Sequence, residues 1–485
     1  MRTILDGLRE LTCDNRTVLT DGAHRVDGAT LHAEAAALAA HLAARLPRGS
    51  VVSFMLPNWS EAAVVYLGAL LAGMVVNPIL PSLRDHELAF ILADTNCRMI
   101  FIPRDFRGHD YAAMLARVTA TIQAPPEIVV VRDSALPTAV APADFPAVSP
   151  DDPALLLYTS GTSGRAKGVL HSHNSIGALI GQLRDHWLIE PGDTFLVPSP
   201  IAHIGGSIYA FECPLLLGTT AVLMERWNAD DAVALMVAER CTHMAGATPF
   251  LEQILDAAER AGTRLPDLKV FICGGASVPP SLIRRATAYF DRARVSRVYG
   301  STEVPVTTVG ALDDPDAAAD TDGRPGIADI RLVEGEIRVR GPQMLVGYRH
   351  PQDESRDADG YFPTGDLARW AGDCLVVTGR AKDIIVRNGE NIAPKEVEDI
   401  LVGHPGIAEI AIVGLPDERT GERACAVIVP AAESRPGVAD LRTFLAEKGI
   451  AQFKIPEQVE TWDALPKNDA GKVLKHQIRA RLTCR

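Results

Sequence analysis

Short apolar runs alternate with amphipathic stretches along most of the chain. The runs have the length of buried strands and occupy residues 51–56, 99–102, 127–131, 155–158, 194–197 and 270–273. Longer stretches with helical periodicity lie at residues 31–46, 230–239 and 250–261. Strands that are buried on both faces read as continuous apolar runs, and helices separate them in the sequence. The pattern therefore predicts an α/β fold, with a large N-terminal domain of mostly parallel sheets flanked by helices.

One apolar run, residues 62–76, is continuous but shorter than the roughly 20 residues that a membrane-spanning helix needs. Ser60 and Glu61 precede it as a helix start, and Asn77 with Pro78 ends it. We expect a core helix that runs into a strand, and no integral membrane segment. Residues 133–150 and 313–326 lack periodicity and are rich in turn-forming residues, which predicts two surface connections.

The pattern changes towards the C-terminus. Pro394 follows Ala393 at the expected first turn of a short helix, and residues 407–413 and 424–429 read as strands. A further helix presents one apolar face, made of Val438, Leu441, Phe444 and Leu445. This compact α+β pattern predicts a separate small domain, so we divide the chain into residues 1–381 and residues 382–485.

Charge and cysteine usage narrow the functional classes. The chain has 485 residues and a formal net charge of −13, which disfavours nucleic acid as a partner. An acidic protein that binds a nucleotide must neutralise the phosphates locally, through a few cations and Mg²⁺. The eight cysteines are scattered without a C-x-x-C pair, which indicates reduced thiols rather than a zinc site or a disulfide framework. The first ten residues lack the apolar segment of a signal peptide, so we expect a cytoplasmic protein.

A glycine- and hydroxyl-rich stretch, TSGTSGRAKG at residues 159–168, follows one of the predicted strands. Glycines let backbone N–H groups converge on an anion, the hydroxyls add donors, and Lys167 adds a positive charge. We expect a ten-residue loop here, followed by a helix that begins at Asn174. The spacing does not match the G-x-x-x-x-G-K-[ST] phosphate loop. Taken alone, the stretch fits a polyphosphate cradle and a flexible connector equally well.

Further motifs follow in a fixed order. They are PIAH at residues 200–203, GGA at 274–276, YGSTE at 299–303, GEI at 335–337, YFPTGD at 361–366, GRAKD at 379–383, GEN at 389–391 and PKNDAGK at 466–472. Together with the loop, this series resembles the adenylate-forming superfamily, which comprises acyl- and aryl-CoA ligases, firefly luciferase and nonribosomal adenylation domains. The resemblance covers nearly the whole chain.

The resemblance implies a site for ATP. Tyr299 offers an aromatic plate for adenine, and the backbone around Gly275 and Ala276 lines the base pocket. Thr302 offers a hydroxyl to the α-phosphate, and Glu303 offers a hard oxygen ligand to Mg²⁺. The expected nucleotide-binding set is Thr159, Ser160, Gly161, Thr162, Ser163, Gly164, Lys167, Gly275, Ala276, Tyr299, Gly300, Asp366 and Arg380, with Glu303 and Thr159 as metal ligands.

Residues near or beyond the domain boundary take further roles from the same resemblance. Asp366 and Arg380 are expected to bind the ribose hydroxyls. Lys472 is expected to contact the carboxylate and the α-phosphate oxygens during adenylation, where a cation stabilises developing charge. Lys382 takes the position of a hinge, which implies that the small domain is mobile. Gly389 matches a glycine beside the pantetheine tunnel of CoA.

The expected acyl pocket is mostly small or apolar. Its segments are residues 203–206, 247–250, 271–275 and 304–306, and His203 resembles a gate at the mouth of the acyl tunnel. Trp227 and the stretch PIAHIGG at residues 200–206 look most like ligases for alicyclic or medium-chain acids. Two positions depart from the family pattern, since Ala166 and Ser277 stand where proline is common. Neither change removes an expected ligand.

The sequence thus predicts an AMP-forming acid–CoA ligase that uses ATP, Mg²⁺ and CoA. A carboxylic acid would first form acyl-AMP with release of pyrophosphate, and the thiol of CoA would then displace AMP. Two alternatives stay open: an acyl-AMP ligase that loads a carrier-protein thiol, and a catalytically silent nucleotide or acyl-AMP sensor. A homodimer is compatible with the sequence, which does not fix the oligomeric state.

Overall fold

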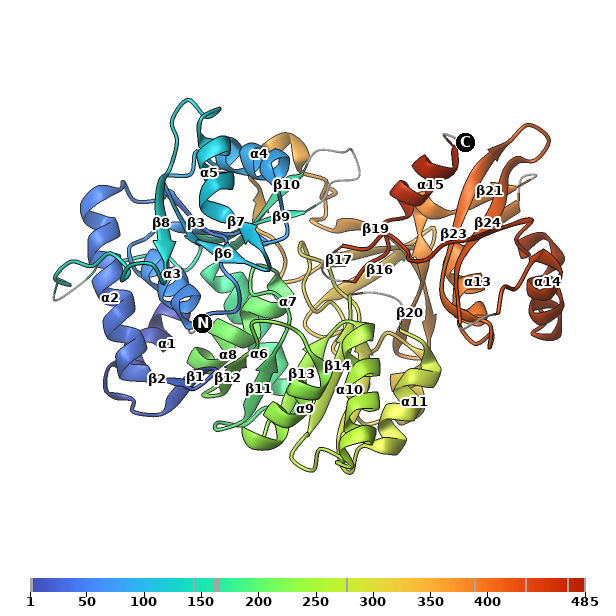
Figure 1. Ribbon diagram of the computed structural model, residues 1–485, viewed down its shortest axis with the longest axis horizontal. Coiled ribbons are helices and arrows are strands. Elements are labelled where there is room, and N and C mark those ends of the chain that lie inside the picture. The colour runs from blue at the N-terminus through green and yellow to red at the C-terminus, as the bar shows by residue number, and fades with distance from the viewer. Residues whose placement is uncertain are drawn as a thin grey trace.

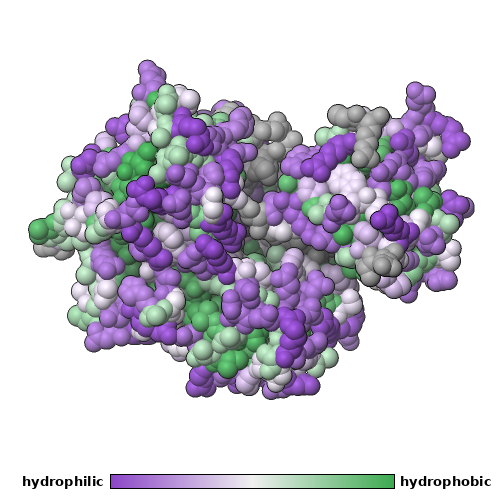
Figure 2. Space-filling view, in the orientation of Figure 1, coloured by the Kyte–Doolittle hydropathy of each residue, from purple (hydrophilic) through white to green (hydrophobic). Residues whose placement is uncertain are grey.

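The computed structural model describes residues 3–142, 145, 147–159, 166–275, 278–387, 390–431, 434–468 and 471–483. Figure 1 shows a large lobe, which carries the strands up to β20, and a small lobe, which carries the strands from β21 onward. Hydrophilic side chains cover most of the face shown in Figure 2, and a notch at its upper edge separates the two lobes. Among the described residues, no helix is long and apolar enough to cross a lipid bilayer.

Two mainly parallel sheets form the centre of the large lobe. The first runs in the order β15 (Arg294–Val298), β14 (Val270–Gly274), β13 (His243–Gly246), β11 (Thr194–Val197), β12 (Thr220–Leu223), β1 (Thr17–Asp21) and β2 (His24–Asp27). The second runs in the order β18 (Gly347–Tyr348), β10 (Lys167–Ser172), β9 (Pro153–Thr159), β4 (Val75–Pro78), β3 (Val51–Phe54), β5 (Met99–Pro103) and β8 (Glu127–Val131). Antiparallel pairing in the described part of these sheets is confined to β2, β10 and β18, so the predicted fold class is confirmed.

Helices cover both sheets. In the large lobe they are α1 (Ile4–Glu10), α2 (Gly28–Arg45), α3 (Ser60–Leu71), α4 (Asp85–Thr95), α5 (Tyr111–Thr119), α6 (His173–His186), α7 (Ile204–Ser207), α8 (Cys213–Leu216), α9 (Ala229–Ala238), α10 (Thr248–Ala261), α11 (Pro280–Tyr289) and α12 (Pro315–Asp320). The apolar run predicted to be a core helix is α3, which is buried on nearly all sides and leads into β4. Gly68 lets α3 approach α2, because a Cβ there would lie 3.0 Å from the Ala35 carbonyl oxygen.

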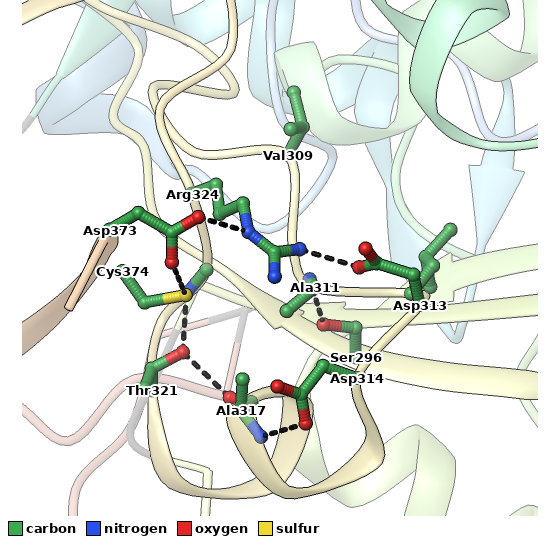
Figure 3. A network of polar contacts seen from close by, with 12 residues as sticks. Ser296, Val309, Ala311, Asp313, Asp314, Ala317, Thr321, Arg324, Asp373 and Cys374 are labelled. Atoms are coloured by element: carbon green, nitrogen blue, oxygen red, sulfur yellow. Dashed lines mark hydrogen bonds and ion pairs between the residues drawn. The ribbon is translucent and has the colours of Figure 1, made fainter. Parts of the chain in front are cut away.

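A third sheet of the large lobe is antiparallel and was not predicted. It runs in the order β16 (Asp329–Val333), β17 (Glu336–Arg340), β19 (Phe362–Ala371) and β20 (Cys374–Arg380). Figure 3 shows how Arg324 fastens the β19–β20 hairpin to the first sheet's loops, because its guanidinium lies between the carboxylates of Asp373 and Asp313. The third sheet is therefore tied to the loops of the first sheet rather than standing as an independent unit.

The prediction of an irregular connection at residues 313–326 was wrong in part, because α12 lies within it. The Asp314 side chain accepts hydrogen bonds from the N–H groups of Asp316 and Ala317, and Pro315 occupies the first turn. Ala318 and Ala319 are buried. A helix of six residues is too short to show a period, which is why the sequence did not predict it.

The ten-residue loop predicted at 159–168 was also wrong in its extent. Strand β9 continues to Thr159, and strand β10 begins at Lys167 and pairs with it in antiparallel register, Lys167 opposite Thr159. The following helix begins at His173, one residue before the predicted start. Glycine-rich composition hid β10, because Gly168 is a poor strand former on its own. Residues 160–165 lie outside the described part of the chain.

The small lobe has its own sheet and its own apolar cores. Its strands are β21 (Ile385–Arg387), β22 (Glu390–Ile392), β23 (Ile407–Asp417), β24 (Gly421–Pro430) and β25 (Gln458–Thr461), and its helices are α13 (Pro394–Leu401), α14 (Val438–Glu447) and α15 (Lys475–Thr483). Both predicted strands are present as β23 and β24, and the predicted apolar helix face is present in α14, where Leu441 and Leu445 are buried. The two cores contain residues of this lobe alone.

Candidate active site

Loops that follow the carboxyl ends of parallel strands gather at one edge of the first sheet. Gly275 follows β14, Tyr299 follows β15 and the segment leading to His203 follows β11. Because β11, β13, β14 and β15 are parallel, these loops meet at the same edge, where α/β proteins commonly bind ligands. Position 300 requires glycine, because a Cβ there would lie only 2.6 Å from the Val306 backbone nitrogen. Ala276 lies outside the described residues.

Tyr299, Asp366 and Arg380 form one polar cluster. The Tyr299 hydroxyl donates to Asp366 Oδ2 at 2.7 Å, and Arg380 Nε lies 2.8 Å from Asp366 Oδ1. Burial, followed by the charge of Asp366, raises the pKa of Tyr299, so its hydroxyl stays protonated. The Asp366 side chain is 7% exposed, and each of its oxygens keeps a further lone pair. The sequence-predicted ribose pair is thus brought together with the predicted adenine plate.

Thr302 and Glu303 sit on the loop that follows Tyr299. Thr302 lines an apolar cavity of about 40 Å³ together with Tyr158, His203 and residues that follow β4. Glu303 is half-buried, and its Oε1 accepts a hydrogen bond from the Tyr348 hydroxyl at 3.4 Å. The carboxylate therefore faces the strand next to β10, on the side where Lys167 lies.

The arrangement suits Mg²⁺ held jointly with a substrate. No group of three or more histidine, cysteine or acidic side chains among the described residues could hold a metal by itself. Mg²⁺ is typically bound through one or two carboxylates plus substrate phosphates rather than in an all-protein cage. Glu303 fits that requirement, and Mg²⁺ bound there would neutralise phosphate charge. Thr159, the second predicted ligand, ends β9 opposite Lys167.

Lys167 is oriented by an acidic and an aromatic neighbour that the sequence did not single out. Its Nζ lies 3.8 Å from Asp353 Oδ1 and 5.3 Å from the centroid of the Tyr348 ring. Both residues come from the segment between the third sheet's second and third strands. The ion pair is loose and partly exposed, so a phosphate group can replace it. Ser160, Gly161, Thr162, Ser163 and Gly164 lie outside the described residues.

Lys472 comes from the small lobe and reaches the large one. A Cβ on the preceding Gly471, whose φ is +77°, would lie 3.7 Å from Pro249 at the start of α10. Asn468 holds the turn, because its Oδ1 accepts from the Lys472 N–H at 2.8 Å. Surrounding protein and then the positive charge of Arg380 lower the pKa of Lys472 to about 8, against the opposing effect of Asp366. The Lys472 residue remains exposed to solvent.

A pH dependence follows from that lowered pKa. Lys472 can stabilise negative charge only as an ammonium ion, and this form is lost as the pH rises through about 8. We expect kcat/KM for adenylation, which reports free-enzyme pKa values, to fall above this pH. The Lys472→Arg variant should lack that fall, since a guanidinium stays charged. An unchanged alkaline limb in the arginine variant would assign the titration to another group.

His203 is one of the residues that line the apolar cavity beside Thr302, whose lining does not include the predicted pocket segments 247–250, 271–275 and 304–306. It precedes α7, and its Nδ1 accepts a hydrogen bond from the Gly205 N–H at 3.2 Å. Burial among neighbouring atoms lowers the pKa of His203, so the imidazole is neutral, although part of the ring is exposed to solvent. A neutral ring at this place can gate an apolar chain.

The adjacent glycines give a matched test of how tightly this segment is packed. A Cβ on Gly206 would lie 2.2 Å from the Pro200 carbonyl oxygen, whereas a Cβ on Gly205 would meet nothing closer than 3.5 Å. We expect Gly206→Ala to lower the free energy of unfolding by about 1–3 kcal/mol. Gly205→Ala should change it by less than about 0.5 kcal/mol. Urea unfolding measures the free energy for both variants. Equal losses would show that the backbone at Pro200 can shift at little cost.

Lys382, which the sequence assigns to the CoA half of the site, is not part of this cluster. Lys382 lies in a short exposed helical turn after β20, and its charge acts on Lys472. Gly389 lies outside the described residues. The structure thus brings together Tyr299, Asp366, Arg380 and Lys472.

Comparison with known proteins shows the family to which the chain belongs. The model of the AMP-binding enzyme family matches residues 10–349, and that of the AMP-binding enzyme C-terminal domain matches residues 396–472. The chain belongs to the AMP-binding enzyme family. The two matches cover most of both lobes, in the order in which the lobes follow each other along the chain.

Among curated relatives of this AMP-binding enzyme is the medium-chain fatty-acid–CoA ligase of Escherichia coli (strain K12), 34% identical over 90% of this chain and 82% of its own. The 3-[(3aS,4S,7aS)-7a-methyl-1,5-dioxo-octahydro-1H-inden-4-yl]propanoyl:CoA ligase of Rhodococcus jostii (strain RHA1) is 33% identical over 96% and 95% of the two chains. The fatty acid–[acyl-carrier-protein] ligase ScoC of Streptomyces coeruleorubidus is 31% identical over 97% and 92%.

The solved structures agree with the fold of this AMP-binding enzyme. The crystal structure of ATP-bound MatB from Rhodopseudomonas palustris superposes with a TM-score of 0.87 at 26% identity, over 99% of each chain. An agreement of this extent covers both lobes and hence their relative placement.

Proposed function

We propose that this protein is an AMP-forming acid–CoA ligase. It converts a carboxylic acid and ATP to acyl-AMP and pyrophosphate, and then converts acyl-AMP and CoA to acyl-CoA and AMP. The observation that supports this most directly is the position of Lys472, which follows Gly471 beside Pro249 of the large lobe and lies within electrostatic range of the Asp366–Arg380 pair. A protein that only senses nucleotide has no need of a cation delivered there from a second lobe.

In the first step, we assign each group by what it can hold. Tyr299 packs against adenine, and Asp366 and Arg380 bind the ribose hydroxyls. The Thr302 hydroxyl donates to the α-phosphate, Lys167 binds the departing pyrophosphate, and Glu303 would hold Mg²⁺, which would supply neutralising charge to the phosphates. The carboxylate oxygen of the acid attacks the α-phosphorus, the bond to the bridging oxygen breaks, and pyrophosphate leaves with the electron pair. Catalysis comes from positioning and from charge stabilisation by Lys472.

The second step needs a different arrangement of the two lobes. We propose domains at residues 1–381 and 382–485, with the hinge at Lys382, because the small lobe has cores of its own. Rotation about a hinge requires only a few residues that absorb backbone change. The rotated small domain would withdraw Lys472 and present the segment around Gly389 to the pantetheine of CoA. The thiol then attacks the acyl carbonyl and AMP leaves.

The acid is proposed to be a medium-chain or alicyclic carboxylic acid. The cavity beside Thr302 is lined mainly by apolar side chains, including Ile79, Leu80 and Ile204, and its described lining offers no carboxylate, lysine or arginine to an amine or a second acid group. At about 40 Å³ it would have to widen to hold such an acid. Two relatives named above act on a medium-chain fatty acid and on a bicyclic propanoic acid. In a site of this kind, binding free energy comes from the apolar area that the acid buries, and acids of neighbouring chain length are discriminated only weakly.

One experiment separates the candidate functions. Pyrophosphate release is measured with ATP, Mg²⁺ and a panel of straight-chain, alicyclic and aromatic acids, with and without CoA. Acid-dependent release together with thioester formation is the expected result. Acyl-AMP that accumulates in the presence of CoA would favour transfer to a carrier protein, as in the ScoC relative. Nucleotide binding without release for any acid would favour a sensor.

Location and assembly are further parts of the proposal. The seven described cysteines are all free thiols, which suits the cytoplasm. Small-molecule acids and CoA are the partners that the reaction requires. A homodimer is also proposed, and light scattering of the purified protein would test it.

A further inference from the structure

A buried histidine on strand β10 contacts the proposed adenylation loop from behind. His171 is fully buried, and its Nε2 lies 2.7 Å from the backbone carbonyl oxygen of Thr302, which is 131 residues further along the chain. Its Nδ1 faces Ser175 Oγ at 3.3 Å. No sequence pattern selects this residue, because a lone histidine in an apolar stretch is usually structural.

The chemistry of the contact fixes the state of the ring. A carbonyl oxygen can only accept, so the proton lies on Nε2 and Nδ1 is the acceptor nitrogen. Complete burial lowers the pKa of His171 to about 4, against the hydrogen bond to Thr302, and the imidazole is therefore neutral. A neutral ring with one defined tautomer makes a directional donor without bringing charge into the core.

The loop around Thr302 has few other backbone anchors. The Glu303 carbonyl accepts from the Leu345 N–H at 2.7 Å, and the Val304 carbonyl accepts from the Ser301 N–H at 3.2 Å. His171 supplies the bond to the carbonyl of Thr302 itself, the residue whose hydroxyl is assigned to the α-phosphate. The same strand begins with Lys167, so one element bears both the phosphate-loop lysine and the anchor of the opposite loop.

We propose that His171 is a positioning residue for adenylation. Through its hydrogen bond to the Thr302 carbonyl, it fixes the main chain so that the Thr302 hydroxyl and the Glu303 carboxylate face the same phosphate group. It also couples this loop to β10 and hence to Lys167. The assignment rests on the proposed adenylation function, because only that function gives Thr302 and Glu303 a common ligand.

Three substitutions separate positioning from packing. His171→Gln places an amide N–H close to the position of Nε2 and can donate to Thr302. His171→Asn is one carbon shorter and reaches only the position of Nδ1. His171→Leu fills the volume without a donor. If His171 serves packing alone, glutamine has no advantage over asparagine or leucine, since all three differ from imidazole in shape.

The three variants and the wild type are compared by three measurements. These are the midpoint of urea unfolding, calorimetric binding of Mg²⁺ with a non-cleavable α,β-methylene ATP, and acid-dependent exchange of pyrophosphate into ATP. For leucine and asparagine we expect exchange to fall by roughly 10²-fold per folded molecule, because small misplacements of catalytic groups cost this much. Affinity for the analogue should fall by about tenfold, the effect of one lost hydrogen bond. The KM for the acid should stay unchanged, and glutamine should restore most of both losses.

Two results would overturn the assignment. One is a leucine variant that, once corrected for the folded fraction, exchanges pyrophosphate and binds the analogue like the wild type. The other is a glutamine variant as impaired as leucine. If the wild type itself shows no exchange with any acid, the proposed function fails instead. In that case the analogue affinities still decide whether His171 orders the Thr302 loop.

Discussion

Replacing Lys472 by alanine is expected to slow adenylation by roughly 10³-fold, because one preorganised donor at a developing charge contributes about that much. Thioester formation from supplied acyl-AMP and CoA should stay within a few-fold of the wild type. The reason is geometric, since Lys472 reaches the Asp366–Arg380 pair only while the small lobe holds its present place against the large one. The measurements are pyrophosphate release in the presence of acid and, separately, thioester formation from the adenylate.

Lys475 provides the matched control for this experiment. It stands three residues later, but its Nζ pairs with Glu398 Oε1 at 2.6 Å inside the small lobe. Lys475→Ala should therefore leave adenylation nearly unchanged after correction for the folded fraction. A Lys472→Ala variant that loses both half-reactions equally would contradict the alternation of domains, because Lys472 would then be needed in both arrangements.

Regular elements with a long apolar pattern could be predicted from the sequence. The strands at residues 127–131 and 194–197 match β8 and β11 residue for residue, and the helix predicted at 31–46 is α2. Strand β11 is mostly buried, and the edge strand β8 has a continuous run of β-branched residues, so each leaves a readable apolar pattern. Strand β10 and helix α12 escaped prediction because glycine in one and a six-residue length in the other leave no readable period.

The residues of the site also fall into two groups, those that a sequence motif predicts and those that it does not. Motif residues such as Tyr299, Asp366 and Lys472 could be predicted from the sequence to share one site, since the family resemblance implies it, and the structure places them in one region. Their supports could not be assigned. Asp353 beside Lys167 and His171 behind Thr302 act across separations that no local pattern encodes. Contacts between distant segments depend on the packing of whole layers, and this information is absent from any short motif.

Replacing Glu303 by glutamine is expected to slow adenylation by roughly 10²-fold and to raise the Mg²⁺ concentration needed for half-maximal rate. Glutamine keeps the shape of the side chain but removes the charge that a hard divalent cation prefers. Among the described residues, no cluster of acidic, histidine or cysteine side chains could take over the metal. Thioester formation from supplied acyl-AMP should persist, since that half-reaction involves no polyphosphate.

Tyr348→Phe is the control, because it removes the hydroxyl that donates to Glu303 at 3.4 Å but leaves the carboxylate in place. A bond of that length is weak, so we expect at most a few-fold loss of adenylation and a small shift in Mg²⁺ dependence. Equal Mg²⁺ dependence in wild type and Glu303→Gln would remove Glu303 from the metal site. The phosphates would then have to be neutralised by Lys167 and Lys472, and adenylation should fall steeply with ionic strength.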